Sequence, residues 1–140
     1  MEIEMVENSL ITEEKTVSNS EIAEKGVHIL AEFFNCKNEE FLTDKVVLRA
    51  SLISSVEKAG LTYLSDSFYK FDNAGVTGVI VLSESHVAFH TWPERGNYVS
   101  LDVFTCNYTC DNTEKAHKLY QSIVEIFQPG KIELVSLRRG

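Results

Sequence analysis

Four segments rich in β-branched and aromatic residues follow one another in the middle of the chain, and no helical pattern lies between them. They cover residues 61–71, 76–82, 87–92 and 98–106. In the last segment Val99, Leu101 and Val103 alternate with other residues, so they share one face of a strand. Strands joined by short turns pair antiparallel, whereas parallel pairing needs a long crossover. The sequence therefore predicts an antiparallel sheet.

Two helices are predicted, one on each side of this run of strands. The first follows a capping pair at Thr43 and Asp44 and stops before Gly60, and its apolar residues have helical spacing: Val46, Ala50, Ile53 and Val56. The second begins near residues 111–114 and stops before Pro129. Its apolar stripe consists of Ala116, Leu119, Tyr120, Ile123, Val124 and Phe127.

Residues 27–34 and 132–137 complete the pattern as the first and last strands along the chain. We therefore predict an α+β fold, an antiparallel β-sheet with helices packed on one face in the manner of an α/β sandwich. The other face of the sheet then has no helix on it. A second subunit is the natural cover for such a face.

Charge and cysteine content limit the partners of the chain. The formal net charge is −8, which disfavours nucleic acid and anionic membranes because both need a basic surface. No apolar run approaches the roughly 20 residues of a membrane-spanning helix. The three cysteines Cys36, Cys106 and Cys110 lack the spacing of a disulfide framework and indicate reduced thiols in a cytoplasm.

The first 24 residues differ in composition from the rest. They carry seven acidic residues and one lysine, the reverse of the charge pattern of a signal peptide. We expect residues 1–24 to form a solvated, disordered extension and residues 25–140 to form a single domain.

The most informative segment is residues 82–106, with the sequence LSESHVAFHTWPERGNYVSLDVFTC. Its pieces SESHVAFHTWPE and LDVFTC, with GVTGVIVL before them and GVHILAEFFNC further upstream, resemble the prokaryotic S-adenosylmethionine decarboxylases. The resemblance extends from about residue 26 to residue 127.

The resemblance implies that the chain is a proenzyme that cuts itself between Glu84 and Ser85. The Ser85 hydroxyl would attack the Glu84 carbonyl, and β-elimination would then leave a pyruvoyl group on the new N-terminus. That group is a carbonyl electrophile that forms a Schiff base with a substrate amine and takes up electrons as CO2 leaves. The family assigns His90 to the cleavage as a proton acceptor, Thr77 to processing through its hydroxyl, and Cys106 to reprotonation of the substrate carbon.

The same resemblance implies a substrate. Phe71 matches an aromatic residue that stacks on adenine, and Glu94 matches a carboxylate that binds the ribose hydroxyls. S-adenosylmethionine is the expected substrate, and its product is the aminopropyl donor for spermidine synthesis. Two departures leave an ornithine or arginine decarboxylase as the alternative: one extra residue between Gly96 and Asp102, and Val27 in place of a basic residue. An inactive regulatory homologue is disfavoured by the intact Ser85, His90 and Cys106.

Two further expectations concern His90. It lies five residues after Ser85, so in an unbroken strand the two side chains face opposite sides. Either the chain bends near Ser85, or the two act in different sites to which two subunits contribute, as in the family's homodimers.

A metal site at His86, His90 and Glu94 would need a helix to place them on one face, and the surrounding residues favour a strand, so no metal is expected.

Overall fold

The computed structural model describes residues 11–17 and 25–139. These residues form a seven-stranded sheet in the order β1-β7-β2-β6-β5-β4-β3. The strands are β1 (Ile11–Val17), β2 (Gly26–Phe34), β3 (Tyr63–Lys70), β4 (Val76–Leu82), β5 (Ser85–Trp92), β6 (Tyr98–Thr105) and β7 (Lys131–Arg139). The helices are α1 (Glu40–Thr43), α2 (Lys45–Lys58), α3 (Thr113–Phe127) and the short 3-10 turn η3 (Pro93–Arg95).

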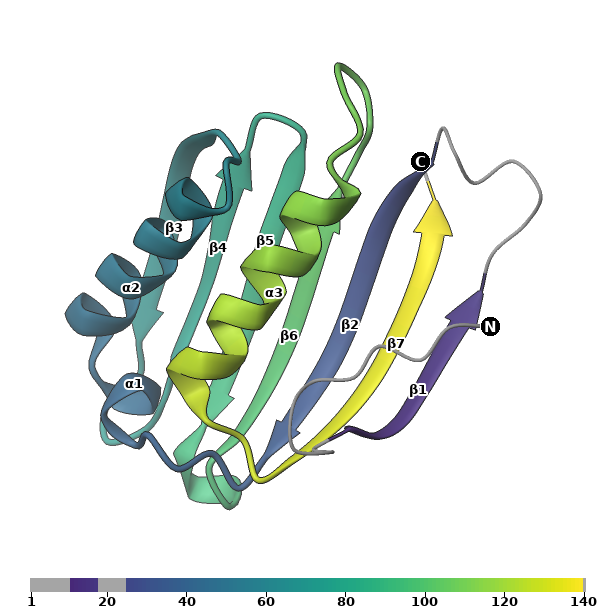
Figure 1. Cartoon of the computed structure of the whole chain (residues 1–140). Coiled ribbons are helices and arrows are strands. Elements are labelled where there is room, and N and C mark those ends of the chain that lie inside the picture. Colours follow the sequence, from purple (N-terminus) through teal and green to yellow (C-terminus); the bar gives the residue numbers. More distant parts are fainter. Residues whose placement is uncertain (1–10, 18–24, 140) are drawn as a thin grey trace.

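The predicted fold class is confirmed. Strands β7, β2, β6, β5, β4 and β3 pair antiparallel. Helices α1, α2 and α3 all lie on one face of the sheet, and no described element covers the other face (Figure 1). We call this uncovered side the open face.

Strand β1 differs from the expectation for the N-terminus. Residues 11–17 pair parallel with β7, so this part of the predicted extension belongs to the sheet. The pairing runs from Ile11 opposite Ile132 to Val17 opposite Leu137. A short acidic segment can join a sheet edge through backbone hydrogen bonds alone. Such pairing does not require alternating apolar residues, so the sequence does not indicate a strand there. Residues 1–10 and 18–24 of the predicted extension lie outside the described residues.

The core lies between the sheet and the helices. In β2 the residues Val27, Ile29, Ala31 and Phe33 are all buried, as alternation predicts. All six residues of the predicted stripe on α3 are buried as well. This packing supplies the apolar burial that stabilises the domain.

The predicted apolar face of α2 is only partly right. Val46 is 73% exposed and Ala50 is also exposed, whereas Leu48, Leu52 and Val56 are buried. Apolar residues occur on more than one side of this helix at the same spacing, so the sequence alone does not show which side is buried. Asp44 caps α2 as predicted, because its side chain accepts hydrogen bonds from the backbone N–H groups of Val46 and Val47.

Strand β5 carries the residues of chemical interest. Val87, Phe89 and Thr91 are buried toward the helices, while His86, Ala88 and His90 are partly or fully exposed on the open face. Antiparallel pairing sets Thr77 of β4 opposite His90 and Thr105 of β6 opposite Ser85. Ser85 at the start of β5 therefore lies beside the end of β6, and His90 near the end of β5 lies beside Thr77 of β4.

Candidate active site

The peptide bond between Glu84 and Ser85 lies where the turn after β4 enters β5. Ser85 has a φ of +138°, a conformation that residues other than glycine rarely adopt. The carbonyl oxygen of Glu84 accepts a hydrogen bond of 2.8 Å from the backbone N–H of Cys106. The Ser85 hydroxyl oxygen lies 3.4 Å from Nδ1 of His86. The bond is thus held in a strained conformation with its carbonyl polarised by a donor.

Cys106 lies directly after β6 and is half-buried. Its backbone carbonyl accepts a hydrogen bond of 2.8 Å from the side-chain amide of Asn112. Gly26 of β2 passes close by, and a Cβ there would lie 2.0 Å from the carbonyl oxygen of Thr105 and 2.9 Å from Cα of Cys106. Only glycine therefore permits this approach. The fold brings Cys106 next to Ser85, although 20 residues separate them.

The side chain of Glu84 is bound by the segment of residues 107–112, which joins β6 to α3. Its carboxylate accepts hydrogen bonds from the backbone N–H of Tyr108 at 3.0 Å, the backbone N–H of Thr109 at 3.3 Å, the Thr109 hydroxyl, and the Asn112 amide at 3.0 Å. The hydrogen bond from the Thr109 hydroxyl and those from the backbone hold the pKa of Glu84 below its ordinary value. Sequence reasoning missed both Thr109 and Asn112, because residues 111–114 gave only the signal of a helix start.

Thr77 and His90 form a second cluster at the other end of β5. The Thr77 hydroxyl and Nδ1 of His90 lie 2.6 Å apart, within hydrogen-bond distance. They are cross-strand neighbours in the β4–β5 ladder. The two residues that the resemblance assigns to processing are therefore side by side.

A pocket of about 530 Å³ adjoins this second cluster. It is lined by Phe71, Ala74, Gly75, Val76, Thr77, His90, Thr91, Trp92 and Glu94. The ring of Phe71 is 47% exposed and makes an edge-to-face contact with Tyr69, with ring centroids 4.9 Å apart. The structure thus brings both predicted substrate-binding residues, Phe71 and Glu94, to one cavity with His90.

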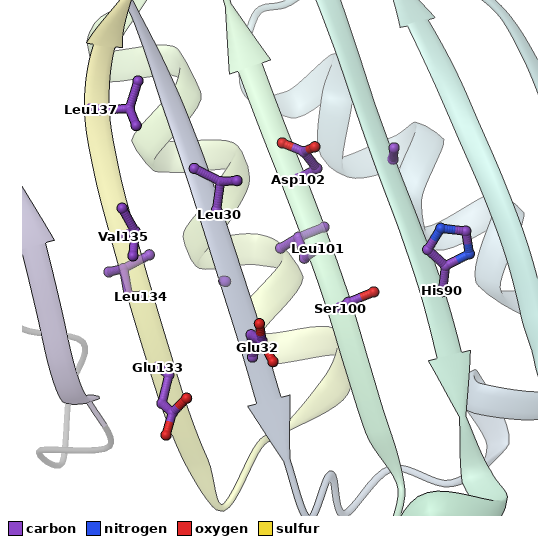
Figure 2. Close-up of a pocket in the computed structure, with 12 residues that line it drawn as sticks. Leu30, Glu32, His90, Ser100, Leu101, Asp102, Glu133, Leu134, Val135 and Leu137 are labelled. Carbon is purple, nitrogen blue, oxygen red and sulfur yellow. The ribbon is translucent and has the colours of Figure 1, made fainter.

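A larger hollow of about 670 Å³ lies on the open face (Figure 2). His90 lines one side of this hollow, and carboxylates of Glu32, Asp102 and Glu133 with apolar residues of β2 and β7 line the rest. Tyr98 donates a hydrogen bond of 2.6 Å to Glu32 at its edge, and burial together with Glu32 raises the pKa of Tyr98 to about 12. His90 therefore lines both hollows.

The two clusters are not brought together within one chain. Five residues of extended strand separate Ser85 from His90, which corresponds to about 16 Å at the usual rise per residue. The positive φ of Ser85 bends the chain only at the first residue of β5 and leaves the remaining alternation intact. Ser85 and Cys106 thus form one half of the predicted site, and Thr77, His90, Phe71 and Glu94 form the other.

Two further observations concern metals and membranes. Within the described residues, no three His, Cys, Asp or Glu side chains are grouped in a way that could hold a metal ion. No helix in the described part of the chain is long and apolar enough to cross a membrane.

Comparison with known proteins gives consistent matches. Residues 27–140 match the model of the S-adenosylmethionine decarboxylase family. The S-adenosylmethionine decarboxylase proenzyme of Archaeoglobus fulgidus is 39% identical over 115 residues, which are 82% of this chain and 97% of that protein. The proenzyme of the same name from Methanococcus maripaludis is 38% identical over 115 residues, covering 82% and 89% of the two chains. The crystal structure of the adenosylmethionine decarboxylase of Aquifex aeolicus superimposes with a TM-score of 0.73 at 32% identity, covering 84% of this chain and 92% of that one.

Proposed function

The chain belongs to the S-adenosylmethionine decarboxylase family, and from that premise we propose that it is a proenzyme that cuts itself between Glu84 and Ser85 and then decarboxylates S-adenosylmethionine. The observation that carries the proposal is the Glu84–Ser85 peptide. It combines a strained φ at Ser85 with a carbonyl oxygen bound by the N–H of Cys106. Strain of this kind is concentrated at functional sites.

The cleavage begins with the Ser85 hydroxyl. Its oxygen attacks the carbonyl carbon of Glu84, so that an ester C–O bond forms, the peptide C–N bond breaks, and the hydroxyl proton passes to the Ser85 amine. The N–H of Cys106 already points at the carbonyl oxygen, where negative charge develops during the attack. Loss of the Ser85 α-proton to a base then breaks the Cβ–Oγ bond and releases Glu84 as a carboxylate. Water replaces the nitrogen, which leaves as ammonia, and residue 85 becomes a pyruvoyl group.

The surroundings of residue 85 suit such a group. The residue is the first of β5, an inner strand of the sheet, and is half-buried with Cys106 beside it. When present, the group supplies an electrophilic carbonyl that binds the substrate amine and accepts electrons during decarboxylation. We assign the donation of a proton to the substrate carbon to the thiol of Cys106, a half-buried residue whose backbone N–H binds the Glu84 carbonyl oxygen.

The remaining residues of the site come from a second copy of the chain. Thr77 and His90 lie about 16 Å from Ser85 of their own chain, too far for proton transfer. A two-fold axis through the open face reverses one copy relative to the other, so the Thr77–His90 end of one protomer meets the Ser85–Cys106 end of its partner. We therefore propose a homodimer with two sites, in which His90 of one protomer is the base that takes the α-proton of Ser85 of the other.

The pocket beside Phe71 supports S-adenosylmethionine as the substrate. An exposed aromatic ring offers a stacking surface for adenine, worth roughly 1–3 kcal/mol per base. Glu94 lines the same pocket and offers two acceptors to a ribose diol. The decarboxylated product is an aminopropyl donor of the kind used in spermidine synthesis.

Processing and turnover can be tested together. Purified wild-type protein is expected as two chains, residues 1–84 and 85–140, with the second blocked to N-terminal sequencing. It should release labelled CO2 from S-adenosylmethionine, and Ser85→Ala should remain one inactive chain. A fully active wild-type enzyme that consists of one intact chain would refute the self-cleavage.

A further inference from the structure

The carboxylate of Glu84 takes no part in the cleavage chemistry, yet it is the most heavily bound side chain near the scissile bond. Four donors from residues 107–112 converge on its two oxygens. Three of them, Tyr108 N–H, Thr109 N–H and Asn112 Nδ2, share the single oxygen Oε1.

Asn112 is the buried member of this set, with 3% of its surface exposed. Its amide nitrogen bridges Glu84 Oε1 at 3.0 Å and the Cys106 carbonyl oxygen at 2.8 Å. Its amide oxygen accepts a hydrogen bond from the Cys110 thiol at 3.3 Å, and its backbone N–H donates to Asn107 Oδ1 at 2.9 Å. The side chain therefore connects the residue before the scissile bond to the residue whose N–H binds the scissile carbonyl.

The position of Asn112 makes this use unusual. It is the N-cap residue of α3, where an asparagine side chain ordinarily accepts a hydrogen bond from the first turn of the helix. Asn112 makes no such hydrogen bond. The Thr113 N–H is bound by the Asp111 carboxylate instead, at 3.0 Å. The capping function is thus transferred to a neighbour, and the Asn112 side chain is free to bind Glu84.

We propose that Asn112 and Thr109 are positioning residues for the self-cleavage: they hold the Glu84 carboxylate so that the scissile peptide keeps its strained conformation and its carbonyl stays on the Cys106 N–H. This inference rests on the proposed function. A strained backbone persists only where its surroundings hold it, and here the side chain and the carbonyl of Glu84 are both tied to residues 106–112. The same four donors disperse the charge of the carboxylate, which otherwise would repel the negative charge that develops on the neighbouring carbonyl oxygen.

The sharpest test is Asn112→Asp. Aspartate has nearly the same shape but lacks the amide donor that binds Glu84 Oε1 and the Cys106 carbonyl oxygen. The substitution also places a second negative charge against Glu84, so a positioning role predicts slower cleavage in protein whose circular dichroism spectrum shows that it is folded. The rate of appearance of fragment 85–140 is followed by gel and intact mass after pulse-labelled cell-free translation. We expect cleavage to slow on the order of ten- to a hundredfold, as for loss of a hydrogen bond to a charged group.

Two further comparisons separate positioning from folding. Glu84→Gln in the Asn112→Asp background removes the like-charge repulsion and should recover part of the rate. Thr109→Val removes the hydroxyl at nearly constant shape and should slow cleavage, whereas Thr109→Ser keeps the hydroxyl and should cleave like wild type. The Thr109 pair lies on an exposed turn, so it remains informative if Asn112→Asp fails to fold.

The outcomes distinguish this inference from the proposed function. Wild-type protein that cleaves, with Asn112→Asp and Thr109→Val cleaving at the same rate, would overturn the positioning role and leave the proposed function intact. Wild-type protein that never cleaves would overturn both.

Discussion

The backbone N–H of Cys106 donates a 2.8 Å hydrogen bond to the carbonyl oxygen of Glu84, which belongs to the peptide bond proposed as the site of self-cleavage. Cys106 is thereby proposed to act in both self-cleavage and decarboxylation, through its backbone N–H in the first and its thiol in the second. Its backbone donor polarises the scissile carbonyl, and its thiol is the proton donor proposed for the substrate. The two functions can be separated by substitution.

Cys106→Ala keeps the backbone N–H and removes the thiol. We expect nearly normal self-cleavage but a loss of turnover on the order of 10²–10⁴, the range for removal of a general acid. Cleavage is read on a gel and turnover from labelled CO2. Cys106→Pro removes the N–H as well and should slow cleavage strongly. Wild-type turnover in Cys106→Ala would show that another group donates the proton.

A mixing experiment tests whether sites are shared between protomers. Cys106→Ala and Glu94→Ala each disable a different half of the site. When the two variants are dissociated, mixed and reassociated, half of the dimers are mixed and each has one intact site. About a quarter of wild-type activity should therefore return. No recovery despite proven exchange, or a monomer by sedimentation at assay concentration, would contradict the shared site.

The substrate pocket can be probed without disturbing the cleavage. Phe71→Ala removes the stacking surface and Glu94→Gln removes the charged acceptor, and neither side chain is among the groups proposed for the cleavage chemistry. Each should raise KM for S-adenosylmethionine, roughly 10-fold or more for Phe71→Ala from the loss of stacking. Phe71→Tyr keeps the ring and is the matched control. CO2 release from ornithine or arginine, with none from S-adenosylmethionine, would refute the substrate and leave the cleavage unaffected.

The ion pair between Arg49 of α2 and Asp66 of β3 predicts a pH dependence of stability. Nε and Nη2 of Arg49 each lie 2.9 Å from the Asp66 carboxylate, and this contact is the main reason why the pKa of Asp66 is below its ordinary value of 3.8. A carboxyl with a depressed folded-state pKa stabilises the protein above its unfolded pKa, and that contribution is lost as the pH falls through the folded value.

Asp66→Asn should therefore lower the urea midpoint of unfolding at neutral pH by a small amount, since the Arg49 side chain is 48% exposed and solvent weakens the pair. The difference from wild type should shrink as the pH falls below about 3.8. Arg49→Lys keeps the charge without the two-point contact and should lie between the two proteins. A difference that stays constant across this range would show that the carboxylate charge does not stabilise the fold.

The sequence by itself determined the antiparallel sheet and the facing of its side chains. Alternation in residues 98–106 correctly assigned Val99, Leu101 and Val103 to the core, because a pleated strand turns successive side chains to opposite faces whatever its neighbours are. The same local rule showed that Ser85 and His90 face opposite sides of an unbroken strand, so that either a bend at Ser85 or a second subunit is needed to bring them to one site. It also predicted an open face that a second copy would cover.

Tertiary structure alone decided which of these residues meet. The register of β5 against β6 brings the carbonyl oxygen of Glu84 within hydrogen-bond distance of the Cys106 N–H. The register of β4 against β5 makes Thr77 and His90 cross-strand neighbours. No local pattern encodes a register between segments 20 residues apart, since it follows from the packing of the whole sheet. The Glu84 contacts of Thr109 and Asn112 were hidden for the same reason: a helix-start motif looks identical whether its asparagine caps the helix or binds a carboxylate 28 residues away.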